Sequence, residues 1–264
     1  MPLDTSAYSL ALLRLDGRRW NELRRLHAQI STQAAADGSA YLEMGNTKVV
    51  CVVTGPTEGR RAATGAAGGG GGGGDGDRAN IEVEIGFAGF SGVERKRRTR
   101  GDKRTAEMQH TLHSAFASTL HTTRYPHSTI TISLHILSQD GSLLAACINA
   151  ATLALIDAGV PMSDYLVACT AGIVSNDASN ANAGADADPL LDLNSLEESD
   201  VPFLTLACLG ETERVAVCVM ETKAPLARLE PMLAVGVDGC KRVRGLLDEV
   251  VRAHGRRMVE GSLG

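Results

Sequence analysis

Apolar and polar residues alternate over several short stretches in the first half of the chain, and this alternation predicts β-strands. In residues 81–87 every second residue is apolar, while two glutamates and a glycine fill the positions between them. Successive side chains of a strand point to opposite faces, so this stretch predicts a half-buried strand. Further strands are predicted near 26–31, 39–44, 48–54 and 130–137. The Gly45-Asn46 turn predicts that two of them form a hairpin.

A mostly apolar stretch from 143 to 158 predicts a helix with almost no polar face. Asp140 and Ser142 are candidate N-caps, and Gly159 followed by Pro161 predicts where the helix ends. Such a helix must be buried. Because it follows directly on the predicted strand at 130–137, a short Asp-Gly-Ser loop brings its N-terminus to the end of that strand. The free N–H groups there favour the binding of a phosphate.

The second half repeats this layout. Strands are predicted near 166–174, 203–209 and 215–221, and apolar positions every three or four residues between Leu229 and Val250 predict one long C-terminal helix. An Asn/Ala/Asp/Gly-rich loop lies between the first two strands. The acidic stretch that follows it, 192–200, is interpreted as either a metal-holding edge or a solvated turn.

Composition narrows the class of protein. A chain of 264 residues with 44% hydrophobic content can form one large core or two fused halves. A net charge of −5 argues against general nucleic-acid binding, so any such role needs a local basic patch. The six cysteines lie mostly in apolar runs without CxxC spacing, which indicates reduced core residues and a cytosolic or nuclear protein. We expect no signal peptide and no membrane span, since the long apolar run contains Asn149, Thr152 and Asp157.

One basic patch is present. Residues 94–104 carry seven cations against two anions and lead into a helix predicted over 105–121. The patch could be a nuclear targeting signal, or it could hold an RNA backbone if it lies near Gly141. His110 and His113 lie one turn apart in that helix without a carboxylate, so we interpret them as surface or packing residues rather than metal ligands.

Two other segments stand out by composition. Five arginines crowd residues 14–25, either as a solvated face or as a contact surface for a partner or for phosphates. Seven consecutive glycines occupy 68–74. They lack the Lys-Ser/Thr ending of a phosphate-binding P-loop, which indicates a flexible surface insertion.

Three stretches together carry a family resemblance: Leu-Asp-Gly-Arg-Arg at 15–19, Gln-Asp-Gly-Ser at 139–142, and Leu-Asp-Leu-Asn-Ser-Leu-Glu-Glu at 191–198. In this order and spacing they resemble the ribonuclease PH family over almost the whole chain, apart from the glycine insertion and the Asn/Ala loop. Within that family, the segments at 16–25, 94–98 and 154–159 are similar to the eukaryotic RNA exosome ring subunit that corresponds to the catalytic subunit of the archaeal ring.

The resemblance implies an α+β fold, the ribonuclease PH fold, which is similar to the second domain of ribosomal protein S5. It consists of two βαβα-type halves with mixed sheets flanked by helices. We expect a single domain over residues 1–264, with a first half at about 15–161 and a second half at about 162–260. Flexible insertions are expected at 62–79 and 175–188.

The resemblance also implies a chemistry. In active members, inorganic phosphate attacks the 3′-terminal phosphodiester of RNA and releases a nucleoside diphosphate. A Gly-Ser/Thr-Arg loop at the helix N-terminus holds the phosphate, and two aspartates six residues apart hold a divalent ion. Basic residues just before the first long helix hold the 3′ end of the RNA.

This chain departs from that pattern at two places. The loop reads Gly141-Ser142-Leu143, so leucine replaces the arginine whose charge-assisted hydrogen bond would contribute roughly 1.5–3 kcal/mol. The carboxylate pair becomes Asp192 and Glu198, and the extra methylene of the glutamate moves the second ligand by about 1 Å from the near-ideal geometry that Mg²⁺ demands. We therefore predict no intact catalytic residue, no metal and no cofactor.

The residues that hold RNA are better retained. Lys103 and Arg104 match the paired basic residues of the family, and four further arginines are candidates for a channel wall. The full set of predicted RNA-binding residues is Arg60, Arg61, Arg97, Arg98, Lys103 and Arg104. Contacts from such residues to phosphates fix position without reading sequence.

The resemblance thus implies a non-catalytic, RNA-binding and structural subunit of an exosome core ring, acting in RNA processing and degradation in the nucleus, nucleolus and cytoplasm. The implied partners are RNA, a second ribonuclease PH-like subunit within a six-membered ring, S1/KH cap subunits and an associated hydrolytic 3′→5′ exonuclease. One alternative is a working phosphorolytic exoribonuclease that uses Ser142, Asp192 and Glu198 with a cation from elsewhere. Another is an unrelated metabolic α/β enzyme.

Overall fold

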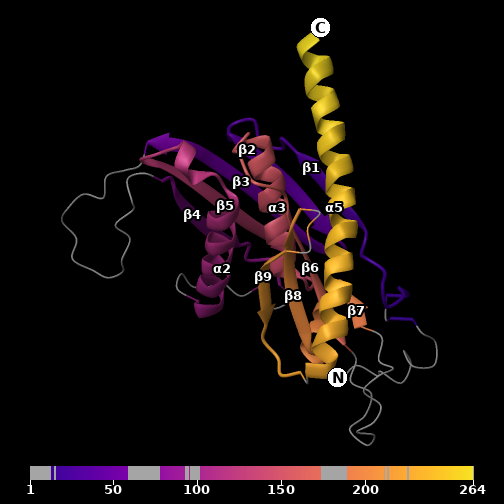
Figure 1. The fold of residues 1–264 in the computed structure, drawn as a ribbon. Helices are drawn as coiled ribbons and strands as arrows, with labels where there is room; N and C mark the ends of the chain where they lie inside the picture. Colours follow the sequence, from indigo (N-terminus) through magenta and orange to yellow (C-terminus); the bar gives the residue numbers. More distant parts are fainter. Residues whose placement is uncertain are drawn as a thin grey trace, which may run out of the picture.

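A computed structural model describes residues 13–14, 16–58, 78–92, 95, 102–173, 189–210, 212, 214–224 and 226–263 of the chain. Two sheets and four helices account for most of them (Figure 1). The predicted insertions at 62–79 and 175–188 lie outside the described residues, except for Arg78 and Ala79.

The first sheet is mixed, with the strand order β1-β2-β3-β5-β4. Only the pair β4 and β5 is parallel, so both strands end at the same edge of the sheet. Gly45 turns β2 into β3 with a φ of +61°, which confirms the predicted hairpin. The strands are β1 (Leu26–Ile30), β2 (Gly38–Met44), β3 (Thr47–Glu58), β4 (Asn80–Phe87) and β5 (Ser128–Ser138).

The second sheet has the order β7-β6-β8-β9, and all pairs of its described strands are antiparallel. Its strands are β6 (Leu166–Ile173), β7 (Pro189–Leu191), β8 (Phe203–Leu209) and β9 (Val215–Met220). The turn between β8 and β9 is short, and short connections favour antiparallel pairs because a parallel pair needs a long crossover. The acidic stretch forms the short helix α4 (Ser195–Asp200) rather than a solvated turn.

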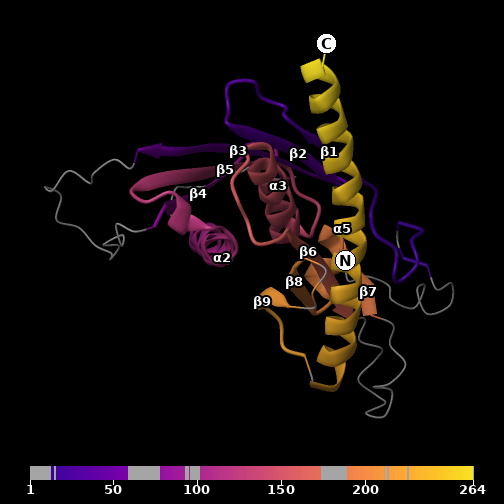
Figure 2. The ribbon, with the colours of Figure 1, turned by 45° about the horizontal axis from the view of Figure 1, so that its top comes forward.

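Helix α3 (Leu143–Asp157) lies between the two sheets (Figure 2). It packs against β2 and β3 on one side and against β6 and β8 on the other. All its residues from Ala145 to Leu155 are buried, which confirms the expectation from its apolar sequence. Contact with a sheet on both sides explains why this helix has no polar face.

The two polar residues in the middle of α3 bond to the backbone of β6. Asn149 donates from Nδ2 to the carbonyl of Ala168 (2.9 Å) and accepts from the Ala168 N–H (2.8 Å). Thr152 donates from Oγ1 to the carbonyl of Leu166 (2.7 Å). Buried backbone groups need partners, so these side chains complete the hydrogen bonding of β6 and tie the helix to the second sheet.

Two further helices cover the sheets. α2 (Lys103–Thr119) packs on β4, and α5 (Leu226–Leu263) packs on β6, β7 and β8 and reaches β1. A short 3₁₀ helix, η1 (Thr122–Arg124), links α2 to β5. The C-terminal end of α5 extends beyond both sheets (Figure 1). Among the described residues, no helix is both long and apolar enough to cross a membrane.

Candidate functional site

The candidate site lies where the parallel strands β4 and β5 end. The loop from Gln139 to Ser142 connects β5 to the N-terminus of α3 at this edge, as the sequence predicts. A cleft of about 450 Å³ opens there between the first turns of α2 and α3, helix α4, and strands β8 and β9. Ligands of α/β proteins commonly bind outside the carboxyl ends of parallel strands. The side chains that line the cleft include those of Arg104, Glu107, Leu143, Glu198 and Glu221.

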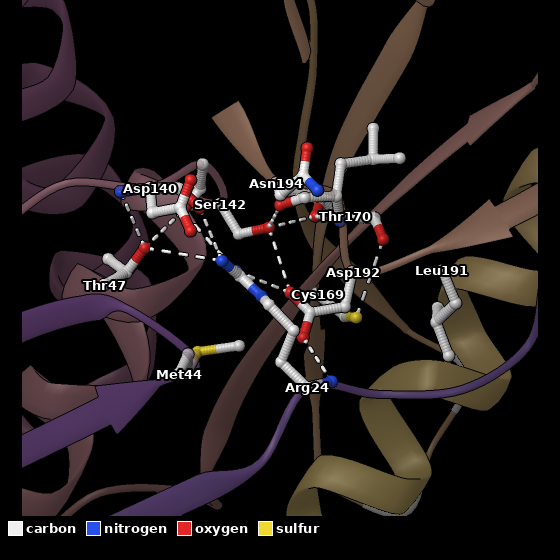
Figure 3. A network of polar contacts seen from close by, with 12 residues as sticks. Arg24, Met44, Thr47, Asp140, Ser142, Cys169, Thr170, Leu191, Asp192 and Asn194 are labelled. Atoms are coloured by element: carbon white, nitrogen blue, oxygen red, sulfur yellow. Dashed lines mark hydrogen bonds and ion pairs between the residues drawn. The ribbon is translucent and has the colours of Figure 1, made fainter. Parts of the chain in front are cut away.

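Ser142 is buried at the corner of the cleft, and its hydroxyl accepts no capping hydrogen bond from the backbone N–H groups of its own helix. Its Oγ instead lies 3.0 Å from Asp192 Oδ1 and 2.9 Å from the carbonyl of Leu193, and it also contacts the hydroxyl of Thr170 (Figure 3). These bonds fasten the start of α3 to the second sheet. Ser142 is therefore the N-cap by position, but its side chain does not perform that role.

Asp192 is tied to Arg24, a residue from the segment before β1. Arg24 Nη2 lies 2.7 Å from Asp192 Oδ1, and the Arg24 backbone N–H donates to Oδ2 over 2.9 Å (Figure 3). Both side chains are buried, at 5% and 1% exposure. Burial acts to raise the pKa of Asp192, but the Arg24 ion pair and its hydrogen bonds outweigh burial and hold that pKa below its ordinary value.

Glu198 directs its carboxylate to the N-terminal end of α3. Its Oε1 accepts a hydrogen bond from the Ser142 backbone N–H over 2.5 Å. Burial raises the pKa of Glu198, while the bond from Ser142 and the nearby guanidinium of Arg24 oppose the increase. The end of a helix at which an anion binds favourably is thus occupied by a carboxylate of the chain itself.

The backbone at this corner adopts unusual conformations. Ser142 and Asp192 have φ of +52° and +53°, in the left-handed region that few residues other than glycine adopt. Gly141 has a φ of +76°, and a Cβ atom there would lie 2.5 Å from the carbonyl carbon of Asn194. Only glycine fits at this position, because the loop before α3 packs directly on the loop before α4.

The other groups in the cleft do not favour an anion. Leu143, at the position of the family arginine, lines the cleft and offers no side-chain donor. Among the described residues, the lining of the cleft includes three carboxylates, those of Glu107, Glu198 and Glu221, and one guanidinium, that of Arg104, which pairs with Glu221 over 3.4 Å. The described lining of the cleft therefore contains more carboxylates than guanidinium groups.

The carboxylates also do not fit the divalent ion that the resemblance associates with active members. Asp192 Oδ1 accepts from both Arg24 and Ser142, and a guanidinium at 2.7 Å repels a second cation. Glu198 Oε1 is engaged by Ser142. Within the described ranges no three His, Cys, Asp or Glu side chains are grouped as metal ligands would be. The donor set therefore suits an internal ion pair rather than Mg²⁺.

The arginine-rich segment at 14–25 is interpreted from the sequence as a surface, and for two of its residues this is wrong. Arg14 is buried and donates from Nε to Glu197 Oε1 over 2.8 Å, and Arg24 is buried against Asp192. Both arginines attach the start of the chain to the second half. Glu197 also forms a capping box with Asn194 at the start of α4. Of the two neighbouring glutamates, Glu197 is thus structural and Glu198 faces the cleft.

Sequence reasoning missed the role of Arg24 and of Thr170. Thr170 lies inside the apolar run of β6, where its hydroxyl contacts Ser142 and accepts from the Leu193 N–H over 3.2 Å. Arg24 lies in the segment 16–25 that carries the resemblance, but the bonding partners of both residues are more than 20 residues away in the sequence and so cannot be read from a local pattern. For Thr170, the one available signal was its position as a polar residue within the otherwise apolar strand β6.

Of the predicted RNA-binding residues, the structure describes Lys103 and Arg104. Both are exposed in the first turn of α2, and Arg104 lies on the wall of the cleft. Arg60, Arg61, Arg97 and Arg98 lie outside the described residues, so they stay predictions. His110 and His113 are exposed on α2, and no grouping of metal-ligand side chains includes them among the described residues.

Comparison with solved structures supports the same fold. The chain superimposes on rice (Oryza sativa) Rrp46 with a TM-score of 0.72 at 24% identity, covering 89% of this chain and 98% of that one. It superimposes equally well, with a TM-score of 0.72 at 20% identity, on a chain of the Archaeoglobus fulgidus exosome with RNA bound to the active site, covering 92% and 96%. The fold class is therefore that of ribonuclease PH proteins, as expected.

Sequence comparison then identifies the family. The RNase PH family, described as the 3′ exoribonuclease family, domain 1, matches residues 22–161, and the chain belongs to this family. It is 39% identical over 257 residues to exosome complex component SKI6 of Saccharomyces cerevisiae, covering 97% of this chain and 96% of that protein. It is 40% identical over 244 residues to human exosome complex component RRP41, covering 92% of each.

Proposed function

We propose that this chain is a non-catalytic subunit of an RNA exosome core ring, where it holds RNA on its way to an associated nuclease. Relatives that match it over nine-tenths of its length are exosome complex components. A related archaeal exosome structure has RNA bound at its active site. Membership of such a complex is thus supported by relationship, whereas the loss of catalysis is supported by the geometry of the cleft.

One observation carries the proposal of lost catalysis. At the N-terminus of α3, where active relatives are expected to hold the attacking phosphate, the Glu198 carboxylate already accepts the bond from the Ser142 N–H. Removing one preorganised donor from such an electrostatic site typically costs on the order of a hundred- to a thousandfold in rate. Here the arginine donor is replaced by Leu143, and a backbone donor is engaged by an internal carboxylate.

The partners follow from the same proposal. The chain would pair with a second ribonuclease PH-like subunit, and three such pairs would close a six-membered ring with S1/KH cap subunits on one face and a hydrolytic 3′→5′ exonuclease on the other. RNA would pass along the side that carries Lys103 and Arg104, with Arg60, Arg61, Arg97 and Arg98 as further contacts. We propose nuclear, nucleolar and cytoplasmic locations, as for an exosome that serves RNA processing and degradation.

A phosphorolysis assay tests the proposal. The chain, assembled with its ring partners but without the hydrolytic nuclease, is incubated with single-stranded RNA, inorganic phosphate and Mg²⁺, and nucleoside diphosphates are measured. We expect none above the background of a reaction without phosphate. Phosphate-dependent release of nucleoside diphosphates would contradict the proposal and favour the enzyme alternative, provided that each partner subunit alone is inactive.

A further inference from the structure

We propose that Phe90 is a stacking platform for an RNA base at the mouth of the cleft. The proposal rests on the proposed function, because it assigns one contact on the RNA path. Aromatic residues make up only 3% of the chain. Among the described Phe, Tyr and Trp residues, Phe90 alone has an exposed side chain, at 69%, whereas the others are buried or half-buried.

The turn that carries Phe90 is held in place by backbone hydrogen bonds. The Ser91 N–H donates to the carbonyl of Ala88 over 2.9 Å and closes the turn. The Ala88 N–H donates to Ile136 at the end of β5 over 3.0 Å, and the Gln139 N–H donates to the Ser91 carbonyl over 3.1 Å. The ring of Phe90 is therefore presented from an anchored turn, which lowers the entropy lost when a base stacks on it.

These bonds also tie the turn that carries Phe90 to the loop that borders the cleft. Because β4 and β5 are parallel, the turn after β4 and the loop after β5 leave the sheet at the same edge. Gln139, which bonds to the turn, lines the cleft together with Arg104. An RNA strand that crosses the first turn of α2 would pass the same edge.

Cations follow Phe90 along the chain, as a site for single-stranded RNA requires. Arg95 is exposed, and its N–H donates to the Gly92 carbonyl over 3.2 Å, so the Arg95 backbone lies close to the end of the Phe90 turn. Lys103 and Arg104 are exposed at the start of α2. Residues 86–92 contain no charged side chain. Proteins that bind single strands without sequence preference combine such cations for the backbone with aromatic rings for the bases.

A contact with a neighbouring subunit would be the other use for an exposed phenylalanine. The centre of a protein interface is an extended apolar patch in which aromatic anchors fill pockets. The sequence neighbours of Phe90 are Gly89, Ser91 and Gly92, which offer no such patch. A single ring on small residues beside cations therefore suits a base better than a protein surface.

The test compares three variants in a binding titration. The full chain, assembled with its ring partners, is titrated with fluorescein-labelled oligouridylate at several salt concentrations, as wild type and as Phe90→Ala, Phe90→Leu and Phe90→Trp. We expect Phe90→Ala to weaken binding by roughly 5- to 150-fold, the range for loss of one stacked base, and Phe90→Trp to retain the affinity. Phe90→Leu should resemble alanine, because leucine has no π-face.

The salt dependence of RNA affinity distinguishes a stacking contact from a contact between a cation and a phosphate. Phe90→Ala should leave the slope of log affinity against log salt unchanged, because the ring neutralises no phosphate. Charge reversal at Lys103 and Arg104 should reduce that slope. If only the charge reversals weaken binding, the stacking proposal fails and the cationic path stands. If only the Phe90 variants weaken it, the cationic path assigned under the proposed function fails.

Two results would overturn the proposal. One is an unchanged RNA affinity of Phe90→Ala in the assembled ring. The other is loss of assembly by Phe90→Ala with no change in the RNA affinity of the free chain, which would assign Phe90 to a subunit interface. Thermal melting of the free variants is the folding control, and we expect no change because the side chain is exposed.

Discussion

The inner corner of the cleft and its rim contain the same types of charged residue and use them in opposite ways. At the corner, Arg24 and Asp192 are 5% and 1% exposed and bond only to other parts of the chain. On the rim, the pair of Arg104 and Glu221 is 65% and 54% exposed. The comparison shows that a paired charged residue is available to a ligand only when its ion pair is exposed to solvent.

Burial decides how much each pair contributes to stability. An exposed ion pair is typically worth about 0–1 kcal/mol, so a phosphate can replace Glu221 as the partner of Arg104. Breaking a buried pair leaves an uncompensated charge and typically costs about 3–5 kcal/mol. The corner is therefore a structural junction, while the rim can bind a ligand. Four variants test this contrast.

Arg24→Ala should produce the largest effect. It leaves Asp192 buried and unpaired, and we expect a loss of about 3–5 kcal/mol in the free energy of unfolding. Urea denaturation followed by circular dichroism measures it. The control is Arg252→Ala on α5, which removes an exposed pair with Asp248 and should cost less than about 1 kcal/mol. Equal effects of the two variants would show that the corner is no more structural than the surface.

Gly141→Ala should come next. The φ of +76° costs a residue with a side chain about 1–3 kcal/mol, and the new Cβ would also press on the backbone of Asn194. The matched control is Gly245→Ala in α5, where nothing lies within 4 Å of the added Cβ. In a helix interior that change should stabilise by roughly 0.5–1 kcal/mol. Thermal melting should therefore shift in opposite directions, and shifts in the same direction would contradict the packing at the corner.

Charge reversal at both Lys103 and Arg104 tests the rim. The free energy of unfolding should change by less than about 0.5 kcal/mol, because both residues are exposed. RNA binding should weaken, and the slope of log affinity against log salt should fall by about 1.4, since each phosphate of a single strand that the two side chains no longer neutralise accounts for roughly 0.7. Reversal of Arg256 and Arg257, exposed near the far end of α5, is the control. If both double variants lose the same RNA affinity, the binding depends only on the net charge of the protein, and the rim does not contact the RNA.

Glu198→Gln should have the smallest effect on stability, and the size of this effect depends on pH. The folded state raises the pKa of Glu198, so it binds that proton more tightly than the unfolded chain does. Stability from this residue is therefore present at low pH and lost as pH rises from the ordinary glutamate pKa through the raised one. Glutamine remains neutral and can still accept from Ser142.

Denaturation of wild type and Glu198→Gln across pH measures this difference. We expect the glutamine variant to be slightly more stable above the titration window and equal to wild type below it. The pH dependence of the stability that Asp192 contributes is opposite to that of Glu198. Its pKa is lowered in the folded state, so the stabilisation is present at neutral pH and lost in acid. The difference in stability between Glu198→Gln and wild type should therefore favour the variant more at neutral pH than in acid. The opposite trend would contradict the burial of this carboxylate.

The main elements of the fold were predictable from the sequence because their signals are local. Alternating apolar residues identify β4, and a mostly apolar stretch identifies α3. Gly159 marks the end of α3. Each of these signals can be recognised without knowing which segments pack nearby. Gly159 has a φ of +68°, and its N–H bonds to Ile156, as the predicted helix end requires. Strand β7 has only three residues, too few to show a period, and it was missed.

The site was only partly predictable because its bonds join distant segments. The family motifs correctly indicated that Ser142, Asp192 and Glu198 would converge. They did not indicate that Arg24, 168 residues before Asp192, would neutralise it. The arginine-rich segment looked like a surface because charge density is visible in a sequence, whereas burial against a distant carboxylate is not.

Glu198 takes the place of an anion at the N-terminus of α3, and the Ser142 amide reports on this contact directly. We suggest titrating the deuterated, ¹⁵N-labelled chain with inorganic phosphate and following the Ser142 amide resonance by NMR. The account predicts no shift beyond that caused by an equal ionic strength of chloride, because Glu198 retains the hydrogen bond. A saturable, phosphate-specific shift of that resonance would contradict it.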